Sequence, residues 1–144
     1  MKWNYATLAA TLALVMTSST LAQDKPKTRF FEMRTYIAHV GKTEVMHARF
    51  RNHTNKLFVK HGIELIGYWT PASSPASGQA DDVASRTLVY ILAYPSREAR
   101  EASWKAFIAD PEWNRAKTES EKDGVLVEKI TSTYLTPTDY SPIK

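Results

Sequence analysis

The chain has 144 residues and no cysteine, and it carries 19 lysine and arginine side chains against 15 acidic ones. This length is typical of a single domain, and the lack of cysteine excludes disulfides and cysteine nucleophiles. The basic residues are scattered, with no run of five or six, so the charge pattern does not indicate a nucleic-acid partner.

The first 22 residues have the organisation of a secretory signal peptide. Lys2 lies in a short basic start. The uncharged apolar run Ala6–Met16 has about 11 residues, well short of the ~20 that span a bilayer. Thr20 and Ala22 occupy the −3 and −1 positions of an A-x-A-like cleavage site. We therefore expect cleavage after Ala22, no stable membrane anchor afterwards, and secretion, with the bacterial periplasm as the destination.

The rest of the chain is predicted to contain a linker at 23–28, one domain at 29–137 and an irregular tail at 138–144. Residue type and hydrophobic periodicity distinguish strands from helices in the domain. The expected strands are Thr28–His39, Ile63–Thr70, Arg86–Tyr94 and Gly124–Leu135; the expected helices are Thr43–Lys60, Ser96–Asp110 and one that restarts at Asp110–Pro111. The small, polar stretch Pro71–Ser85 is predicted to be a loop.

This β-α-β-β-α-β order predicts an α+β fold, a ferredoxin-like sandwich with two helical segments covering one face of the sheet. The other face would carry Phe31, Met33 and Ile37 from the first strand and Val89 and Ile91 from the third. Left exposed, these side chains would form a large apolar patch. We therefore expect a homodimer in which two such sheets pack face to face.

Three of the four histidines lie in the helix expected at Thr43–Lys60 or just after it. Residues on a helix advance about 100° and rise 1.5 Å each, so His47 and His61 would lie about 21 Å apart along the axis. No H-x-x-x-H or H-E-x-x-H pair is present. No metal site is predicted.

His53 falls in a stripe with Met46, Phe50 and Leu57 that is expected to face the sheet. Two interpretations remain open for a histidine in this position. It is either a buried side chain satisfied by one hydrogen bond, or an acid or base lining a pocket.

Four segments resemble the NIPSNAP family in order and spacing: FEMRTYIAHVGK (Phe31–Lys42), KHGIELIGYWT (Lys60–Thr70), LVYILAYPSREAREASWKAFIADPEW (Leu88–Trp113) and a last strand ending in leucine. The resemblance covers about 30–137 and implies a dimeric α/β barrel. That superfamily also includes haem-degrading monooxygenases, cofactor-free quinone-forming monooxygenases, EthD-like proteins and relatives of chlorite dismutase. The family has no agreed set of catalytic residues that could be carried over to this sequence. The Pro71–Ser85 loop departs from the family pattern, which usually has a shorter turn at this place.

A pocket in this fold would lie between the sheet and the helices. The candidate ligand-binding residues are Arg34, Tyr36, Trp69, Tyr90 and Trp104, and the candidate catalytic residues are Arg34, Tyr36 and His53. The planar fork of Arg34 would bind a carboxylate or enolate oxygen, and the tyrosines could donate hydrogen bonds to developing oxygen charge. Alternatively, the aromatic residues belong to the core and Arg34 pairs with Glu32.

Three functions fit this sequence. The first is a carrier of a small apolar or aromatic molecule, the second is a cofactor-free or haem-linked monooxygenase or isomerase, and the third is an interaction module whose interior is filled by its own side chains. No cofactor is predicted for the first or the last. Haem would be the cofactor of the second, with His53 or His61 as its axial ligand.

Overall fold

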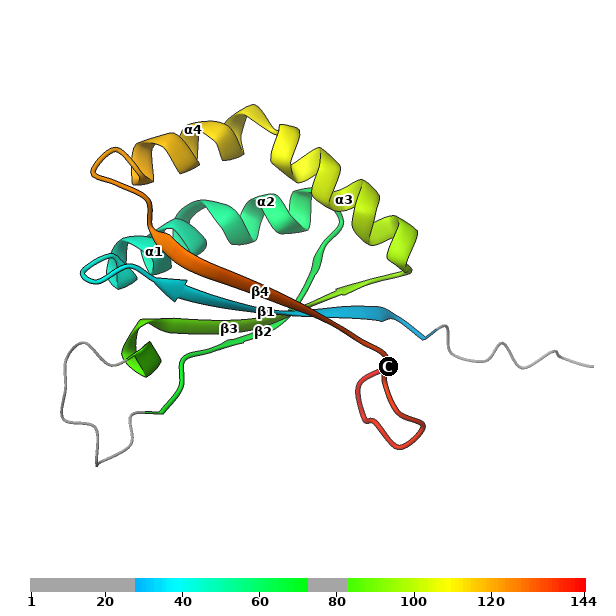
Figure 1. Ribbon diagram of the computed structural model, residues 1–144. Helices are drawn as coiled ribbons and strands as arrows, with labels where there is room; N and C mark the ends of the chain where they lie inside the picture. Colours follow the sequence, from blue (N-terminus) through cyan, green and yellow to red (C-terminus); the bar gives the residue numbers. More distant parts are fainter. Residues whose placement is uncertain (1–27, 73–82) are drawn as a thin grey trace, which may run out of the picture.

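The computed structural model describes residues 28–72 and 83–144, and it shows one sheet with the four α-helices on one face (Figure 1). The strands β1 (Phe30–Ala38), β2 (Glu64–Trp69), β3 (Thr87–Tyr94) and β4 (Val127–Leu135) pair antiparallel in the order β2-β3-β1-β4. The helices are α1 (Thr43–Arg49), α2 (Asn55–Lys60), α3 (Arg97–Ala109) and α4 (Pro111–Ser120). The predicted ferredoxin-like α+β sandwich is therefore confirmed.

The predicted signal peptide lies outside the described residues, as does 73–82 of the predicted loop. A short 3₁₀ turn, Val83–Arg86, leads from that loop into β3. The last strand begins at Val127 rather than at Gly124. No helix in the described part of the chain is both long and apolar enough to cross a membrane.

The first helical segment has the predicted bounds but contains a π-helical turn, Phe50–Thr54, between α1 and α2. A π turn holds more residues than an α turn, so the inward position after Phe50 falls on Thr54. Thr54 is 1% exposed and its hydroxyl donates a hydrogen bond to the Arg49 carbonyl, 3.2 Å away. His53 is exposed. The prediction that His53 faces the sheet is therefore wrong.

Capping residues end or begin three of the helical segments. Gly62 follows α2 with a positive φ of 74°, a conformation that glycine adopts without steric cost. The Ser96 hydroxyl accepts a hydrogen bond from the Ala99 amide at the start of α3, and the Asp110 carboxylate accepts one from the Glu112 amide at the start of α4.

Asp110 also ties the end of α2 to the junction between α3 and α4. Its Oδ2 accepts hydrogen bonds from Lys60 Nζ at 2.8 Å and from His61 Nε2 at 2.7 Å. These bonds, together with the one from the Glu112 amide, hold the pKa of Asp110 below its usual range. His61 therefore joins the end of α2 to the junction between α3 and α4.

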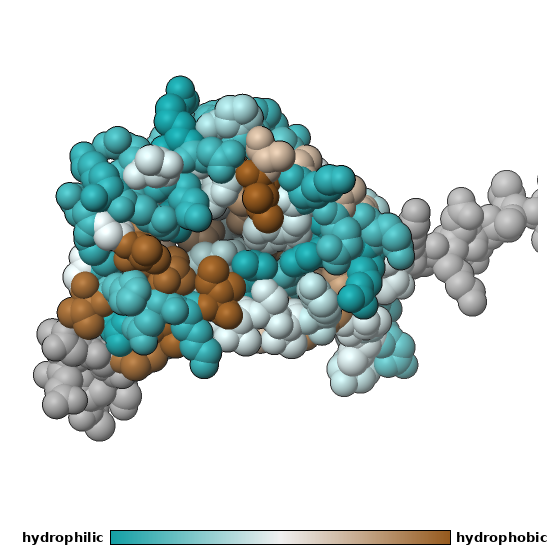
Figure 2. All heavy atoms as spheres, turned by 45° about the horizontal axis from the view of Figure 1, so that its top comes forward, coloured by the Kyte–Doolittle hydropathy of each residue, from teal (hydrophilic) through white to brown (hydrophobic). Residues whose placement is uncertain are grey.

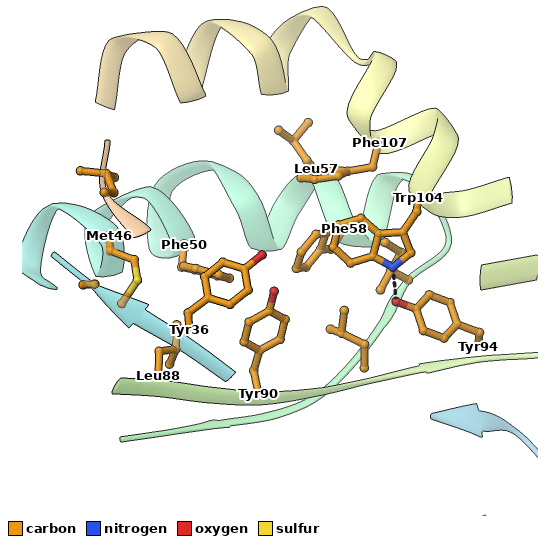
Figure 3. Close-up of a cluster of buried hydrophobic side chains, with 14 residues drawn as sticks. Tyr36, Met46, Phe50, Leu57, Phe58, Leu88, Tyr90, Tyr94, Trp104 and Phe107 are labelled. Atoms are coloured by element: carbon orange, nitrogen blue, oxygen red, sulfur yellow. Dashed lines mark hydrogen bonds between the residues drawn. The ribbon is translucent and has the colours of Figure 1, made fainter. Parts of the chain in front are cut away.

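Aromatic side chains fill much of the space between the sheet and the helices (Figure 3). Phe58 of α2 is 1% exposed and lies near their centre. Its ring centroid lies 4.8 Å from that of Phe107, 5.5 Å from that of Trp104 and 6.3 Å from that of Tyr90. Such tilted and edge-to-face pairs contribute beyond their buried area.

The opposite face of the sheet is only partly covered. Met33, Ile37 and Val89 are half-buried there, whereas Phe31 is 5% exposed. The chain after β4 folds back over this end of the sheet, on the side away from the helices (Figure 1). The predicted tail is irregular as expected, but it also packs against the sheet.

Candidate functional site

A row of polar side chains crosses the sheet beneath the helices. Strand pairing places Ser132, Arg34, Tyr90 and Tyr68 side by side on β4, β1, β3 and β2. Alternation along β1 brings Glu32 to the same face. Glu32, Arg34 and Tyr90 are 0%, 9% and 0% exposed. A charged pair therefore lies inside the layer where an apolar core would be expected.

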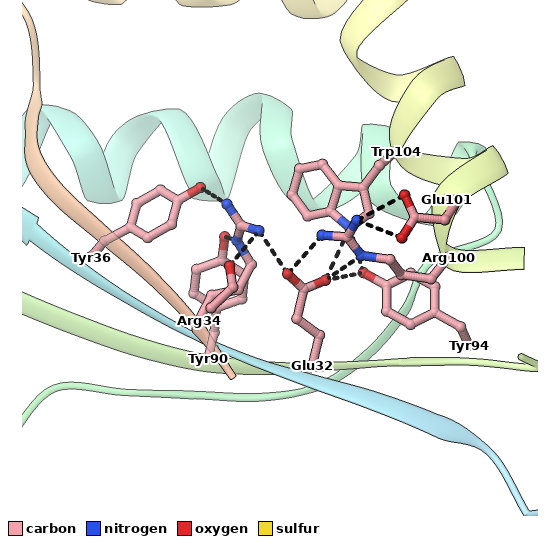
Figure 4. A network of polar contacts seen from close by, with 9 residues as sticks. Glu32, Arg34, Tyr36, Tyr90, Tyr94, Arg100, Glu101 and Trp104 are labelled. Carbon is pink, nitrogen blue, oxygen red and sulfur yellow. Dashed lines mark hydrogen bonds and ion pairs between the residues drawn. The ribbon is translucent and has the colours of Figure 1, made fainter. Parts of the chain in front are cut away.

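The Arg34 guanidinium is held by four hydrogen bonds (Figure 4). Its Nε donates to the Tyr90 hydroxyl at 3.0 Å, and its Nη2 donates to the Tyr36 hydroxyl at 3.2 Å. Its Nη1 donates to Glu32 Oε1 at 2.8 Å and to Ser132 Oγ at 2.9 Å. The predicted alternative that Arg34 pairs with Glu32 is confirmed, and most of the guanidinium is already occupied.

Glu32 is the centre of a second set of contacts in the same network. Its carboxylate accepts hydrogen bonds from Arg100 Nε and Nη2, each at 2.9 Å, from Trp104 Nε1 at 3.2 Å and from the Tyr94 hydroxyl at 3.3 Å. Burial alone would raise the pKa of Glu32, but the hydrogen bonds from Arg100 and Arg34 outweigh it and lower that pKa. Glu32 is therefore ionised at neutral pH.

Tyr90, Tyr94 and Arg34 keep their usual charge at neutral pH. Burial raises the pKa of the Tyr90 hydroxyl and that of the Tyr94 hydroxyl, so both are neutral. Burial would lower the pKa of Arg34, but Tyr90, Tyr36 and Glu32 raise it, so Arg34 is charged.

A cleft of about 300 Å³ opens beside this network, between the sheet and the helices. Its lining is largely aromatic. Tyr36 contributes from β1, Phe50 and Phe58 from the first helical segment, and Trp104 and Phe107 from α3. Lined in this way, the cleft has the concave, mostly apolar character of small-molecule sites.

The rim of the cleft is apolar and exposed. Ile108, Val125 and Ile130 are 59%, 58% and 50% exposed, and all three line the cleft. Apolar side chains are visible around the hollowed surface between the helices and the sheet (Figure 2). Large apolar side chains that gather at one opening mark a site for a partner or ligand more than single exposed ones do.

Four of the predicted site residues come together here, and two do not. Tyr36 and Trp104 line the cleft, and Arg34 contacts both, with its Cζ 4.4 Å from the Trp104 ring centroid. The Tyr90 hydroxyl accepts a hydrogen bond from Arg34. Trp69 is 50% exposed at the end of β2 and borders a different hollow, and the exposed His53 borders a third, between the first helical segment and α4.

Sequence reasoning missed the central place of Glu32 and the contribution of Arg100. Glu32 alternates with aromatic residues on the face of β1 that packs under the helices, and this mixture of rings and charge was the signal that could have found it. Arg100 lies on a charged helix, where one more arginine gives no signal. Only the packing of α3 against β1 and β3 brings it to Glu32.

The described residues contain no group of three or more histidine, aspartate or glutamate side chains that could hold a metal ion. None of the four histidines, all of which the structure describes, lines the cleft. An axial histidine for haem is therefore missing from this site, and His61 is engaged by Asp110. The residues present do not fit the haem-linked alternative.

The sheet order, the helices on one face and the cleft between the layers define this protein as a ferredoxin-like α+β protein with an interlayer site. Residues 31–142 match the NIPSNAP family, and the chain belongs to that family. The match runs past 137, so the segment predicted as a tail belongs mostly to the family domain. Among curated proteins, none matches this sequence.

Solved structures of NIPSNAP proteins share this fold. A NIPSNAP family protein of unknown function from Agrobacterium tumefaciens is 22% identical, with a TM-score of 0.66 over 83% of this chain and 97% of that one. An uncharacterized NIPSNAP-like domain protein from Burkholderia xenovorans is 19% identical, with a TM-score of 0.64 over 81% of this chain and 90% of that one. At these identities the comparison shows the fold alone.

Proposed function

We propose that this NIPSNAP-family protein binds a small apolar or aromatic molecule in the cleft between its sheet and its helices. The observation that carries this proposal is the cleft itself, about 300 Å³ with an aromatic lining and an exposed apolar rim. A ring system placed there would remove apolar surface from water on both partners. The interaction-module alternative needs an interior filled by its own side chains, and the cleft argues against it.

Native mass spectrometry of the protein purified from its own host tests this proposal. We expect the protein to carry a defined additional mass. Val125→Asn should lower the occupancy because it removes an apolar rim residue that is 58% exposed, without changing the charge. Val59→Asn is the matched control, since Val59 is 62% exposed on α2 outside the cleft. A protein free of any added mass would contradict the proposal.

A catalytic role is the second candidate, favoured by the contact of Arg34 with two tyrosine hydroxyls. Preorganised donors of this kind stabilise oxygen charge that develops during a reaction. If the protein is an enzyme of the cofactor-free monooxygenase or isomerase kind, the molecule that co-purifies should change in mass or structure on incubation in air. If the molecule is recovered unchanged, the protein is a carrier.

We also propose that the protein is a homodimer joined through the sheet face away from the helices. Val89 is half-buried at the middle of that face, so Val89→Asp should place a charge in the interface and give a monomer at micromolar concentration. Size-exclusion chromatography with light scattering would show the change. Val59→Asp, on the helical side, should leave the dimer intact, and a monomeric unsubstituted protein would overturn the proposal.

Export to the periplasm is the third part of the proposal, and it rests on the organisation of residues 1–22. The intact mass of the protein from a periplasmic extract should correspond to a chain that starts at Gln23. A charged residue in the apolar run, such as Leu12→Arg, should leave the full-length chain in the cytoplasm. Recovery of the full-length chain from the periplasm would show that cleavage does not occur there.

A further inference from the structure

The charges around the cleft do not balance. Arg34 and Arg100 share one buried carboxylate, that of Glu32. The second carboxylate on Arg100 belongs to Glu101, whose side chain is 57% exposed, so it compensates little at the buried end. In the part of the chain that the structure describes, the remaining hydrogen-bond partners of Arg34 are uncharged hydroxyls.

The wall of the cleft adds one positive charge that is unpaired among the described residues, that of Lys117. Arg49 is 6% exposed and pairs with Glu121 at 2.8 Å. Lys117 also lines the cleft, and no ion pair of its ammonium group occurs within residues 28–72 and 83–144. The charge of Arg49 is balanced by that of Glu121, which also lines the cleft, whereas Lys117 is exposed and attracts an anion through solvent, an effect that salt screens.

Hydrogen-bond counting shows where an anion would bind. A guanidinium has five N–H donors. Arg34 uses four of these donors: the one on Nε, the two on Nη1 and one of the two on Nη2. The remaining N–H donor is therefore on Nη2, whose other N–H bonds to the Tyr36 hydroxyl. Tyr36 and Tyr90 each carry one phenol proton, and within the described residues both hydroxyls accept from Arg34, so the Tyr36 proton is placed to be donated to an oxygen in the cleft that Tyr36 lines.

We propose that the molecule bound in the cleft is an apolar or aromatic anion whose negative oxygen accepts from Arg34 Nη2 and the Tyr36 hydroxyl. This inference rests on the proposed ligand-binding function and names the chemical class of the ligand. One free N–H on Arg34 fits a single oxygen, so the bidentate fork expected from the sequence is not available. A carboxylate would use one of its oxygens, and a phenolate or enolate its only one.

Four probes with a common nitrobenzene body test the charge preference: 4-nitrobenzoate, 4-nitrophenolate, 4-nitrobenzyl alcohol and 4-nitrobenzylammonium. Isothermal titration calorimetry of the full protein at about pH 8 would give their affinities. We expect both anions to bind about tenfold more tightly than the alcohol, because hydrogen bonds to charged groups are about twice as strong as neutral ones. The tighter of the two anions then identifies carboxylate or phenolate as the preferred source.

Two variants locate the effect at the cleft. Tyr36→Phe should weaken the anions about tenfold and leave the alcohol within about twofold. Tyr140→Phe is the matched control, because Tyr140 is 83% exposed in the C-terminal segment. Lys117→Gln, at an exposed position that should not affect folding, should weaken the anions about two- to threefold and the alcohol not at all.

Each outcome decides a different point. Anion preference that Tyr36→Phe and Lys117→Gln both reduce supports the inference. Equal binding of alcohol and anions, or tighter binding of the ammonium probe, would overturn the inference and leave the proposed ligand-binding function standing. If none of the four probes binds, the ligand-binding function is overturned and the inference with it.

Discussion

Replacing Glu32 with glutamine should lower the free energy of unfolding by about 3–5 kcal/mol, because it leaves buried arginine charge without its partner. Glu32 is 0% exposed and bridges Arg34 and Arg100. Glutamine keeps the size of the side chain but removes its charge. Urea unfolding followed by circular dichroism would measure the loss.

Glu101→Gln is the matched control for this substitution. Glu101 contacts the same Arg100 but its side chain is 57% exposed, so its loss should cost no more than about 1 kcal/mol. An unfolding midpoint for Glu32→Gln equal to that of the unsubstituted protein would show that the buried pair contributes no stability.

Because of Glu32, the free energy of unfolding should also decrease as the pH becomes acidic. The pKa of Glu32 is lower in the folded protein than the ordinary pKa of a glutamate side chain, because the effect of burial is outweighed by the hydrogen bonds that Arg100 and Arg34 donate to it. A carboxyl group with a lowered folded pKa contributes its full stability above the unfolded value and loses it as the pH falls through the folded one. In Glu32→Gln, this part of the acid dependence should be absent from urea midpoints measured between about pH 6 and pH 3.

Phe58→Ala should destabilise the protein by about 3–5 kcal/mol, the range for removing a large aromatic side chain from a core. Phe58 is 1% exposed and contacts aromatic side chains from β3, α3 and the π-helical turn. The loss would join the space it vacates to the cleft that it lines.

Thermal or urea unfolding checks this value, with Val59→Ala as the control. Val59 is the next residue along α2 but is 62% exposed, so its truncation should change stability by less than about 0.5 kcal/mol. A loss below about 1 kcal/mol for Phe58→Ala would mean that the surrounding rings collapse into the vacated space.

The two predictions concern the same layer of the protein, because the charged network and the aromatic core share their members. Trp104 packs against Phe58 and donates to Glu32. The Tyr90 ring stacks on that of Tyr68, with 5.4 Å between the ring centroids, and the Tyr90 hydroxyl accepts a hydrogen bond from Arg34. The apolar rings exclude water from the charges, and the charges fix the orientation of the rings around the cleft. Side chains held in this way are preorganised for a ligand.

The amino-acid sequence by itself determined the elements, the fold class and the family resemblance. Period-two and period-3.6 patterns are local properties, and so are the caps at Ser96 and Asp110 and the glycine at 62. They predicted the strand and helix bounds to within a few residues. Alternation along β1 also placed Arg34 and Tyr36 correctly on one face.

Only the tertiary structure decided which of the candidate residues share a site. The π-helical turn moved His53 to the surface, because one altered turn rotates the residues that follow it. Trp69 lies at the exposed end of an edge strand. Arg100 reaches Glu32 across 68 positions of sequence, a distance that no local pattern encodes. The charge balance of the cleft therefore depends on contacts between segments far apart in the chain.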